Sequence, residues 1–156
     1  MISFSVAVDP KLGIGKNNVL PWHIKDELKL FKANTLYHYI VMGQTTFDNL
    51  PRKLVDRKVV VVSNDPGYTP KDPDAILERD LIAFLDKHKD DDEEYIVCGG
   101  ASIFRQAYKY SRKAYVSFIK EEFNCDTYFD NFKLDEWNIV KEEDNPEFIF
   151  RLLERK

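Results

Sequence analysis

Short apolar runs rich in β-branched and aromatic residues recur along the chain and predict at least five β-strands. They lie at Ile2–Val8, Tyr39–Met42, Lys58–Ser63, Tyr95–Cys98 and Tyr115–Ile119. Several runs are apolar at consecutive positions, as Val59–Val62 is. Strands that are apolar on both faces are typical of the centre of a sheet covered by helices on both sides. The pattern therefore predicts an α/β architecture.

Segments of helical periodicity alternate with these strands. They lie at Lys25–Thr35, Thr45–Leu50, Arg79–Lys89 and Ser102–Tyr110. The alternation predicts parallel strands joined by right-handed crossovers. Near the C-terminus, Trp137–Lys141 and Phe148–Leu153 flank the polar stretch Glu142–Glu147, which predicts an antiparallel hairpin at the sheet edge. The sheet is therefore expected to be mixed.

Length and composition indicate one folded domain. The chain has 156 residues, of which 44% are hydrophobic and 13% aromatic. Domains of roughly 100 to 200 residues are typical, so we expect a single domain over residues 1–156. The 23 Lys and Arg against 27 Asp and Glu give a net charge of −4. That sign argues against a chain whose main role is to bind nucleic acid, but it is compatible with a local basic pocket.

The sequence predicts neither a membrane segment nor an exported protein. No apolar run approaches the roughly 20 residues of a membrane span. Met1–Asp9 lacks the basic and long apolar regions of a secretory signal. Cys98 and Cys125 are the only cysteines and form no CxxC pair, so no disulfide framework or zinc site is indicated. A reducing cytoplasm fits this composition best.

Glu27 is the most informative candidate for chemistry. On a helical wheel it shares one face with Ile24, Leu28, Phe31 and Thr35, whereas Asp26 falls on the opposite face. A carboxylate on an apolar surface is costly, and burial raises its pKa towards the range useful for proton transfer. Alternatively, Glu27 is a first-turn acid stabilised by the helix dipole. The helix pattern alone slightly favours this second interpretation.

Three glycine-bearing segments are candidates for ligand contact. Gly13–Asn18, followed by Leu20-Pro21-Trp22, is either a mobile lid or an ordinary connection. In Tyr95–Phe104 and Met42–Thr46, a strand ends in glycine and continues into a helix. Such turns let the backbone approach phosphates at a helix N-terminus, although each is equally typical of a tight structural turn. Together the two turns suggest a dinucleotide.

A series of short motifs follows in order along nearly the whole chain. They are Ala7-Val8-Asp9, Ile14-Gly15, Leu20-Pro21-Trp22, Asp26-Glu27-Leu28, Phe31-Lys32, Asn34-Thr35-Leu36, Val41-Met42-Gly43, Thr46-Phe47, Leu54, Arg57-Lys58, Gly99-Gly100 and Asp126-Thr127-Tyr128-Phe129. In this order and spacing they resemble dihydrofolate reductase. The resemblance implies a single-domain fold with a mostly parallel eight-stranded sheet, an antiparallel C-terminal hairpin and about four helices.

The resemblance also implies the reaction and its residues. The reaction is NADPH-dependent reduction of 7,8-dihydrofolate to 5,6,7,8-tetrahydrofolate, which supports one-carbon and thymidylate metabolism, with antifolates as inhibitors. The implied catalytic residues are Glu27, Trp22 and Ser117. The implied substrate-binding residues are Ser5, Ala7, Glu27, Leu28, Phe31, Leu50, Arg52, Arg57, Cys98 and Ser117. Among these, Arg57 matches the arginine that pairs with the substrate's glutamate carboxylate, and Arg52 could assist at the rim.

For NADPH, the resemblance implies contacts from the first strand, the glycine turns and the loop, with Gly15–Trp22 as a mobile active-site loop. The implied residues are Ala7, Ile14, Gly15, Leu20, Gly43, Gln44, Thr45, Thr46, Ser63, Asn64, Cys98, Gly99, Gly100, Ala101, Ser102, Ile103 and Phe104. Gln44 and Ser102 stand where many family members carry cations, so use of NADH is also possible. Lys16 or Lys71 are candidates to replace those cations.

Two other functions share this fold. One is a folate-binding structural protein that serves in an assembly, and the other is a reductase acting on a riboflavin precursor. The chain shows no additional assembly segment, and Trp22, Glu27 and Arg57 together favour folate. The expected protein is therefore a monomeric, cytoplasmic enzyme.

Overall fold

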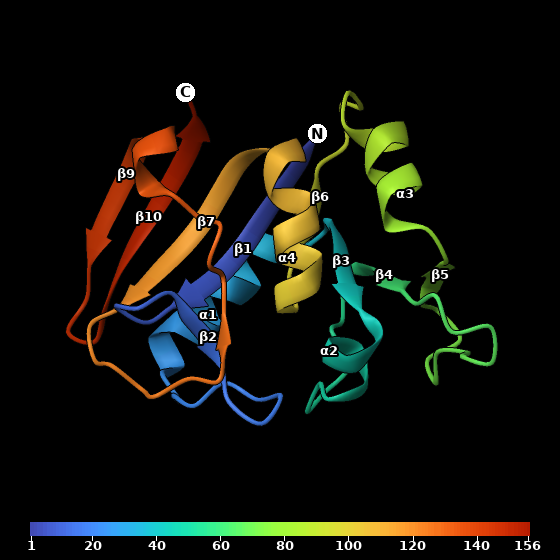
Figure 1. Ribbon diagram of the computed structural model, residues 1–156, viewed down its shortest axis with the longest axis horizontal. Helices are drawn as coiled ribbons and strands as arrows, with labels where there is room; N and C mark the ends of the chain where they lie inside the picture. The colour runs from blue at the N-terminus through green and yellow to red at the C-terminus, as the bar shows by residue number, and fades with distance from the viewer.

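Eight strands form the central sheet of the computed structural model, which describes residues 1–156 (Figure 1). Their order across the sheet is β5-β4-β3-β6-β1-β7-β10-β9. The bounds are β1 Ile2–Val8, β3 Tyr39–Gly43, β4 Lys58–Val62, β5 Ile76–Glu78, β6 Tyr95–Val97, β7 Ser111–Ile119, β9 Trp137–Asp144 and β10 Phe148–Arg155. The six strands from β5 to β7 are parallel, and β10 and β9 add an antiparallel edge. A separate two-stranded sheet pairs β2 (Gly13–Gly15) with β8 (Thr127–Tyr128).

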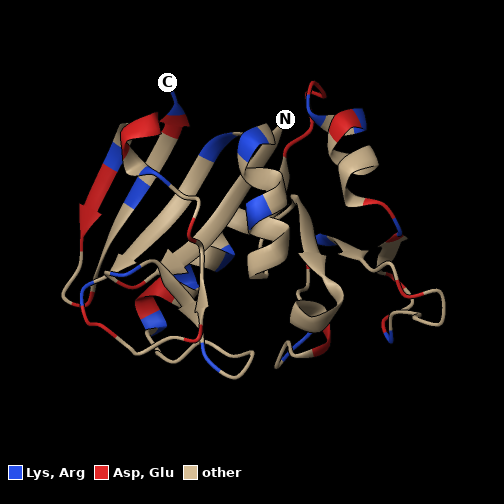
Figure 2. Cartoon of the chain, viewed as in Figure 1, with Lys and Arg blue, Asp and Glu red and all other residues tan.

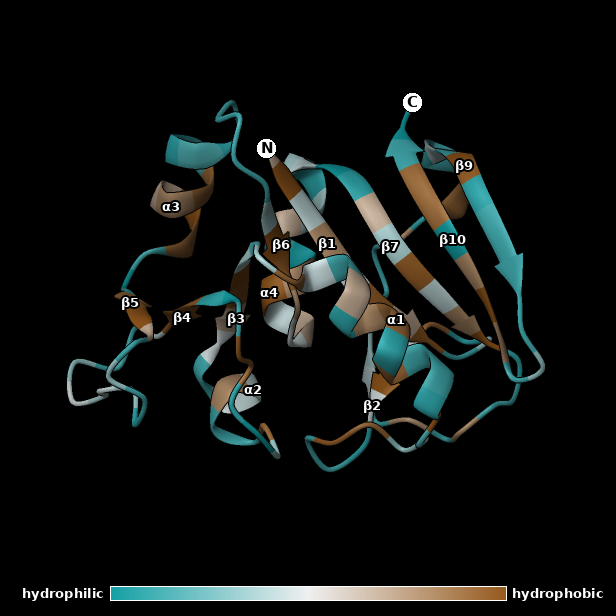
Figure 3. Cartoon of the chain, turned by 180° about the vertical axis from the view of Figure 1, so that it is seen from behind, coloured by the Kyte–Doolittle hydropathy of each residue, from teal (hydrophilic) through white to brown (hydrophobic).

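Helices cover both faces of the sheet. They are α1 Lys25–Thr35, α2 Gln44–Asp48, α3 Leu81–His88 and α4 Ala101–Ala107, with 3-10 turns η1 Tyr108–Tyr110 and η2 Leu134–Glu136. Helices α3 and α4 lie in front of the sheet in Figure 1, and α1 lies in front in the reverse view of Figure 3. None of these helices has the length and apolarity needed to cross a membrane.

The two faces of β1 supply two separate hydrophobic cores. Ile2, Phe4, Val6 and Val8 belong to the core that includes α3 and α4 residues, whereas Ala7 belongs to the core that includes Trp22. Brown strands in Figure 3 show how apolar the sheet is. The ring of fully buried Phe4 has aromatic neighbours on several elements, with centroids 5.3 to 6.2 Å away, and the nearest is that of Phe129 at 5.3 Å. This alternation leaves small side chains on the α1 face, where room for a ligand is needed.

The structure confirms the predicted five strands, the C-terminal hairpin and helix α1. It corrects several boundaries. Strand β7 begins at Ser111 rather than Tyr115, and the hairpin strands extend so that only residues 145–147 form the turn. Helix α3 begins at Leu81 rather than Arg79, because the Asp80 carboxylate caps it by accepting a hydrogen bond from Ala83 N at 3.1 Å. The strands β2, β5 and β8 were not predicted, since each has only two or three residues.

Candidate active site

The carboxyl ends of the parallel strands meet at one edge of the sheet, and the two glycine turns lie there side by side. Gly43 N, at the end of β3, donates a hydrogen bond to Gly99 O at 2.9 Å. Gly99 follows the end of the neighbouring strand β6. In open α/β sheets, ligands bind at this edge. Helix α1 and the loop that precedes it approach the same edge from the face of the sheet opposite to α3 and α4 (Figure 3).

Glu27 is buried against the sheet, with 9% of its surface exposed, whereas Asp26 beside it is exposed. Burial raises the pKa of the Glu27 carboxyl, and interaction with the Ser117 hydroxyl partly opposes this rise. Ser117 lies on β7 directly beside Ala7 of β1. The structure therefore brings Glu27, Ser117 and Ala7 together, as predicted. Although Glu27 also lies in the first turn of α1, the helix-dipole interpretation does not account for its burial.

Trp22 provides a second polar group in this region. Its indole is 7% exposed and packs edge-on against Phe123, with ring centroids 5.4 Å apart. The indole Nε1 is buried and has no hydrogen-bond partner within the chain. Because an unpaired buried donor is costly, this N–H is suited to a polar group of a ligand or to water.

Arg57 is held in place without an acidic partner. Its Nη1 donates to Thr35 Oγ1 at 3.1 Å, and its Nε donates to Val55 O at 3.0 Å. Thr35 Oγ1 in turn donates to Phe31 O at 2.7 Å, which fixes the hydroxyl at the end of α1. Partial burial lowers the pKa of Arg57. An oriented guanidinium with no carboxylate of its own is suited to binding a carboxylate ligand.

The glycine turns leave little room for side chains. A Cβ atom added to Gly43 would lie 3.1 Å from Ile103 Cγ1, and one added to Gly100 would lie 3.2 Å from Thr46 Oγ1. Gly99 has a φ of 123°, in the region that side chains disfavour. The backbone of both turns can therefore approach a ligand closely. This cradle fits the pyrophosphate and ribose of a dinucleotide, as the sequence suggested.

A cation lies near Ser63, although neither lysine considered from the sequence provides it. Ser63 Oγ donates to Gln44 Oε1 at 2.6 Å, which joins the ends of β4 and β3. Arg79 Nη1 donates to Ser63 O at 3.4 Å, and its Nη2 donates to Tyr68 O at 3.0 Å. Sequence reasoning missed Arg79, because nothing in the sequence places it beside Ser63.

The two lysines lie elsewhere. Lys71 Nζ donates to Asp48 O at 3.4 Å, at the end of α2. Lys16 is exposed and pairs through its backbone with Val19, within the Gly15–Trp22 loop. Neither side chain has a contact with Ser63 or Gln44, so Arg79 is the better candidate for a cation at this end of the site.

Two aspartates accept backbone hydrogen bonds from the Gly15–Trp22 loop and from the segments beside it. Asp126 Oδ2 accepts from Asn17 N at 3.0 Å, and this bond lowers the pKa of Asp126. Buried Asp9 accepts from Gly13 N at 2.8 Å and from Phe123 N at 3.2 Å. This role of Asp9 was not predicted from the sequence, where the available signal was an acid that directly follows a buried strand.

The other predicted site residues divide by exposure. Those buried are Ser5, Gly15 and Phe104. Those half-buried are Ile14, Phe31, Leu50, Cys98, Ala101 and Ile103. Those exposed are Leu20, Leu28, Thr45, Arg52, Asn64 and Ser102. Of the face predicted for α1, Glu27 and Thr35 are buried as expected, whereas Leu28 is 43% exposed, because it lies at the edge of that face.

Comparisons with known proteins agree on one family. A family model described as dihydrofolate reductase matches residues 1–149. A dihydrofolate reductase of Bacillus subtilis (strain 168) is 34% identical over 164 residues, covering 100% of this chain and 95% of the relative. A dihydrofolate reductase of Staphylococcus haemolyticus is 34% identical over 161 residues, covering 99% of this chain and 95% of the relative.

A solved structure shows the same fold. Dihydrofolate reductase from Enterococcus faecalis, complexed with NADP(H) and RAB-propyl, superposes with a TM-score of 0.87 at 25% sequence identity, covering 100% of this chain and 96% of that chain. This likeness confirms the fold that the ordered motifs implied. With the family model and the relatives, it shows that the chain belongs to the dihydrofolate reductase family.

Proposed function

We propose that this chain is an NADPH-dependent dihydrofolate reductase that converts 7,8-dihydrofolate to 5,6,7,8-tetrahydrofolate and so supports one-carbon and thymidylate metabolism. The observation that carries the proposal is the buried Glu27 carboxyl beside Ser117, near the carboxyl end of β7 and so at the sheet edge that also holds the paired glycine turns. The direct test is oxidation of NADPH by the purified protein in the presence of dihydrofolate. A folate-binding structural protein would bind dihydrofolate without this oxidation.

The glycine turns and their neighbours would hold the cofactor. The glycines at Gly43, Gly99 and Gly100 support this assignment, since they carry no side chain that would keep a ligand away from their backbone N–H and C=O groups. Thr45 and Thr46 at the start of α2 and Ala101–Phe104 in α4 would complete the contacts. When bound there, NADPH would supply the hydride for the reduction.

Glu27, Ser117 and Trp22 would bind the pterin ring. A carboxylate that accepts hydrogen bonds from the pterin's amino group and adjacent ring nitrogen fixes the ring's orientation. Because burial raises its pKa, this carboxylate takes up a proton more readily than an exposed glutamate, and it would thereby promote protonation of the ring nitrogen that receives the proton, through water. The free indole N–H of Trp22 is suited to hold such a water. Ser5, Ala7 and Cys98 would form the walls of the pocket.

Arg57 would bind the glutamate part of the substrate. Its guanidinium can form two parallel hydrogen bonds with a carboxylate, and its anchors on Thr35 and Val55 fix the orientation beforehand. Leu28, Phe31 and Leu50 would pack the ring system between Glu27 and Arg57. The exposure of Leu28 is compatible with contact to a ligand rather than to the protein core.

Thr35 is a positioning residue in this proposal. The Thr35→Val substitution keeps the shape but removes the hydroxyl that accepts from Arg57. We expect the KM for dihydrofolate to rise about threefold to tenfold with kcat unchanged, because one hydrogen bond that orients the guanidinium is lost. Steady-state kinetics measure this split. Thr35→Ser should restore the KM, and a fall in kcat at constant KM would contradict the proposed role.

Arg79 would supply positive charge for the 2′-phosphate of NADPH, in place of the cations absent at Gln44 and Ser102. We expect Arg79→Gln to lower the ratio of kcat/KM for NADPH to that for NADH by about fivefold to tenfold, because a charge-assisted contact is removed. Lys71→Gln is the matched control and should leave the ratio unchanged. An equal fall in kcat/KM with NADPH and with NADH would show that Arg79 acts only by stabilising the fold.

We further propose that residues 1–156 form a single domain that works as a cytoplasmic monomer. The match of the family model across residues 1–149 and the single continuous eight-stranded sheet support one domain. The net charge of −4 supports the absence of a nucleic-acid partner. Antifolates are expected to compete with dihydrofolate, since the pterin pocket would bind their ring in the same place.

A further inference from the structure

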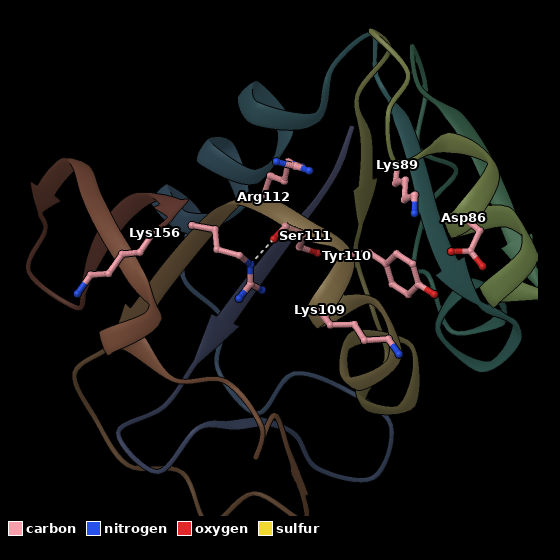
Figure 4. Close-up of a pocket in the computed structure, with 8 residues that line it drawn as sticks. Asp86, Lys89, Lys109, Tyr110, Ser111, Arg112 and Lys156 are labelled. Carbon is pink, nitrogen blue, oxygen red and sulfur yellow. Dashed lines mark hydrogen bonds between the residues drawn. The ribbon is translucent and has the colours of Figure 1, made fainter.

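A pocket of about 550 Å³ lies at the opposite edge of the sheet from the active site (Figure 4). Three segments form it: the end of α3 with Lys89, the start of β7 with η1 before it, and the end of β10. Ser111 at the start of β7 pairs with Ile2 at the start of β1, which places the pocket at the amino ends of the parallel strands. It shares no residue with the predicted folate and NADPH sites.

The side chains around this pocket are mostly basic. We call it the basic pocket and define it by Lys89, Lys109, Arg112, Arg155, Lys156 and Asp86. Five of these six side chains are cationic, in a chain whose net charge is −4. Blue segments mark the start of β7 and the C-terminal end of the chain, after β10, in Figure 2. The charge at this location is therefore opposite in sign to that of the whole protein.

None of the five cations is neutralised by a salt bridge. Some basic residues elsewhere do have such partners, as Lys120 has in Asp144 at 2.7 Å and Arg151 in Glu142 at 2.7 Å. By contrast, the Lys109 side chain has no hydrogen bond or salt bridge within the chain, and its Nζ lies 5.5 Å from the ring centroid of Tyr110. Gathering unpaired cations around a concave surface raises their mutual repulsion, and a bound anion would relieve it.

Arg155 is fixed in the wall of the pocket. Its Nε donates to Ser111 O at 2.7 Å, a bond drawn as a dashed line in Figure 4, and its Nη2 donates to Tyr108 O. The guanidinium also lies 4.4 Å from the ring centroid of Trp137 and 4.8 Å from that of Tyr108. Its Nη1 has no hydrogen bond within the chain. A preorganised guanidinium with free N–H groups binds phosphate oxygens at low entropic cost.

We propose that the basic pocket is a binding site for a triphosphate chain. Five cationic side chains outnumber the carboxylates of Asp86 and of the chain end at Lys156, so the pocket complements an anion of several negative charges, and both arginine and lysine bind phosphates. The volume lies within the range of about 300 to 1,000 Å³ that small-molecule sites occupy, and the mostly charged lining favours a charged ligand. The triphosphate belongs either to inorganic tripolyphosphate or to a nucleoside triphosphate. The proposal does not depend on the reductase function.

Isothermal titration calorimetry at low salt tests this proposal. The protein is first saturated with NADPH, so that the nucleotide site is filled, and is then titrated with tripolyphosphate and separately with ATP. The test variant is Lys109→Gln with Arg112→Gln, because both side chains are exposed and neither has a hydrogen bond within the chain. The control is Lys120→Gln with Lys141→Gln, which removes the same charge elsewhere on the surface. Thermal unfolding confirms that both variants fold.

We expect one tripolyphosphate to bind per chain, with affinity about tenfold or more weaker in the Lys109/Arg112 variant and within twofold of the unsubstituted protein in the control. Affinity should fall as salt is added. Equal binding of ATP would assign the site to triphosphate chains of either source, whereas binding of tripolyphosphate alone would assign it to the free anion. The proposal would be overturned if neither anion bound, or if the Lys109/Arg112 variant and the Lys120/Lys141 control lost the same amount of affinity.

Discussion

Glu27→Gln is expected to lower kcat/KM for dihydrofolate by about 100-fold or more at neutral pH, the usual scale for loss of a general acid or base. The substitution keeps the size of the side chain and its place beside Ser117. It removes the only buried carboxyl at the proposed pterin site. Steady-state kinetics over a range of pH measure the effect.

The pH dependence gives the more specific result. Burial raises the pKa of Glu27, so the unsubstituted enzyme retains its proton to higher pH than an exposed glutamate would. Its rate should therefore hold at acidic pH and fall once the pH passes that raised pKa. The Gln variant depends on substrate protonated in solution, a fraction that grows about tenfold for each unit of falling pH above the substrate's own pKa. The difference in kcat/KM between the Gln variant and the unsubstituted enzyme should therefore become smaller as the pH falls.

Asp26→Asn is the matched control for this experiment. Asp26 is adjacent to Glu27 in sequence, and its substitution removes the same charge. Its side chain, however, is exposed on the other side of α1. We expect near-normal kinetics from this variant. A Glu27→Gln enzyme with normal rates across the pH range, or an Asp26→Asn enzyme with the same deficit, would contradict the assignment of Glu27.

Arg57→Ala is expected to raise the KM for dihydrofolate by about 10-fold to 100-fold with a smaller effect on kcat. The reason is loss of charge-assisted hydrogen bonds to the substrate's glutamate carboxylate, each of which contributes about 1.5 to 3 kcal/mol. The side chain is anchored by Thr35 and Val55 and has no acidic partner in the chain, so its removal leaves no unpaired buried carboxylate. Steady-state kinetics with dihydrofolate measure the KM.

Two comparisons isolate the role of Arg57. A pterin substrate that lacks the glutamate tail should be reduced equally well by the Arg57→Ala variant and the unsubstituted enzyme. Arg52→Ala removes an exposed arginine nearby in sequence and should change the KM far less. If Arg57→Ala raised the KM equally for dihydrofolate and for the pterin without the tail, the proposed contact with the tail would be wrong. The loss of binding would then arise at the pterin ring or in the fold.

Features with a local pattern were predicted well from the sequence. Helix α1 has the predicted bounds, and its wheel distinguished Glu27 from Asp26 because that distinction depends only on the 100° step between residues. The wheel failed at Leu28, since it cannot tell a face that contacts the sheet from one that borders a ligand site. The ordered motifs supplied the fold and the glycine turns.

Features that depend on contacts between distant residues were not predicted. Strand β7 begins at Ser111 because the Ser111 hydroxyl donates to Ala107 O at 2.9 Å and Arg155 donates to Ser111 O. No apolar alternation marks the start of this strand. The placement of Arg79 beside Ser63, and of Thr35 beside Arg57, likewise depends on packing between separate elements. The basic pocket is formed by residues from three separate segments. The sequence was compatible with a local basic pocket but could not place it.

Steady-state oxidation of NADPH by the purified protein with dihydrofolate, followed by loss of the reduced-nicotinamide absorbance, tests the central claim most directly. The same assay with NADH measures cofactor preference. We expect rapid turnover that requires dihydrofolate and is faster with NADPH than with NADH, despite Gln44 and Ser102. Folded protein that binds dihydrofolate but oxidises neither cofactor would contradict the proposed enzyme and favour a structural folate-binding protein.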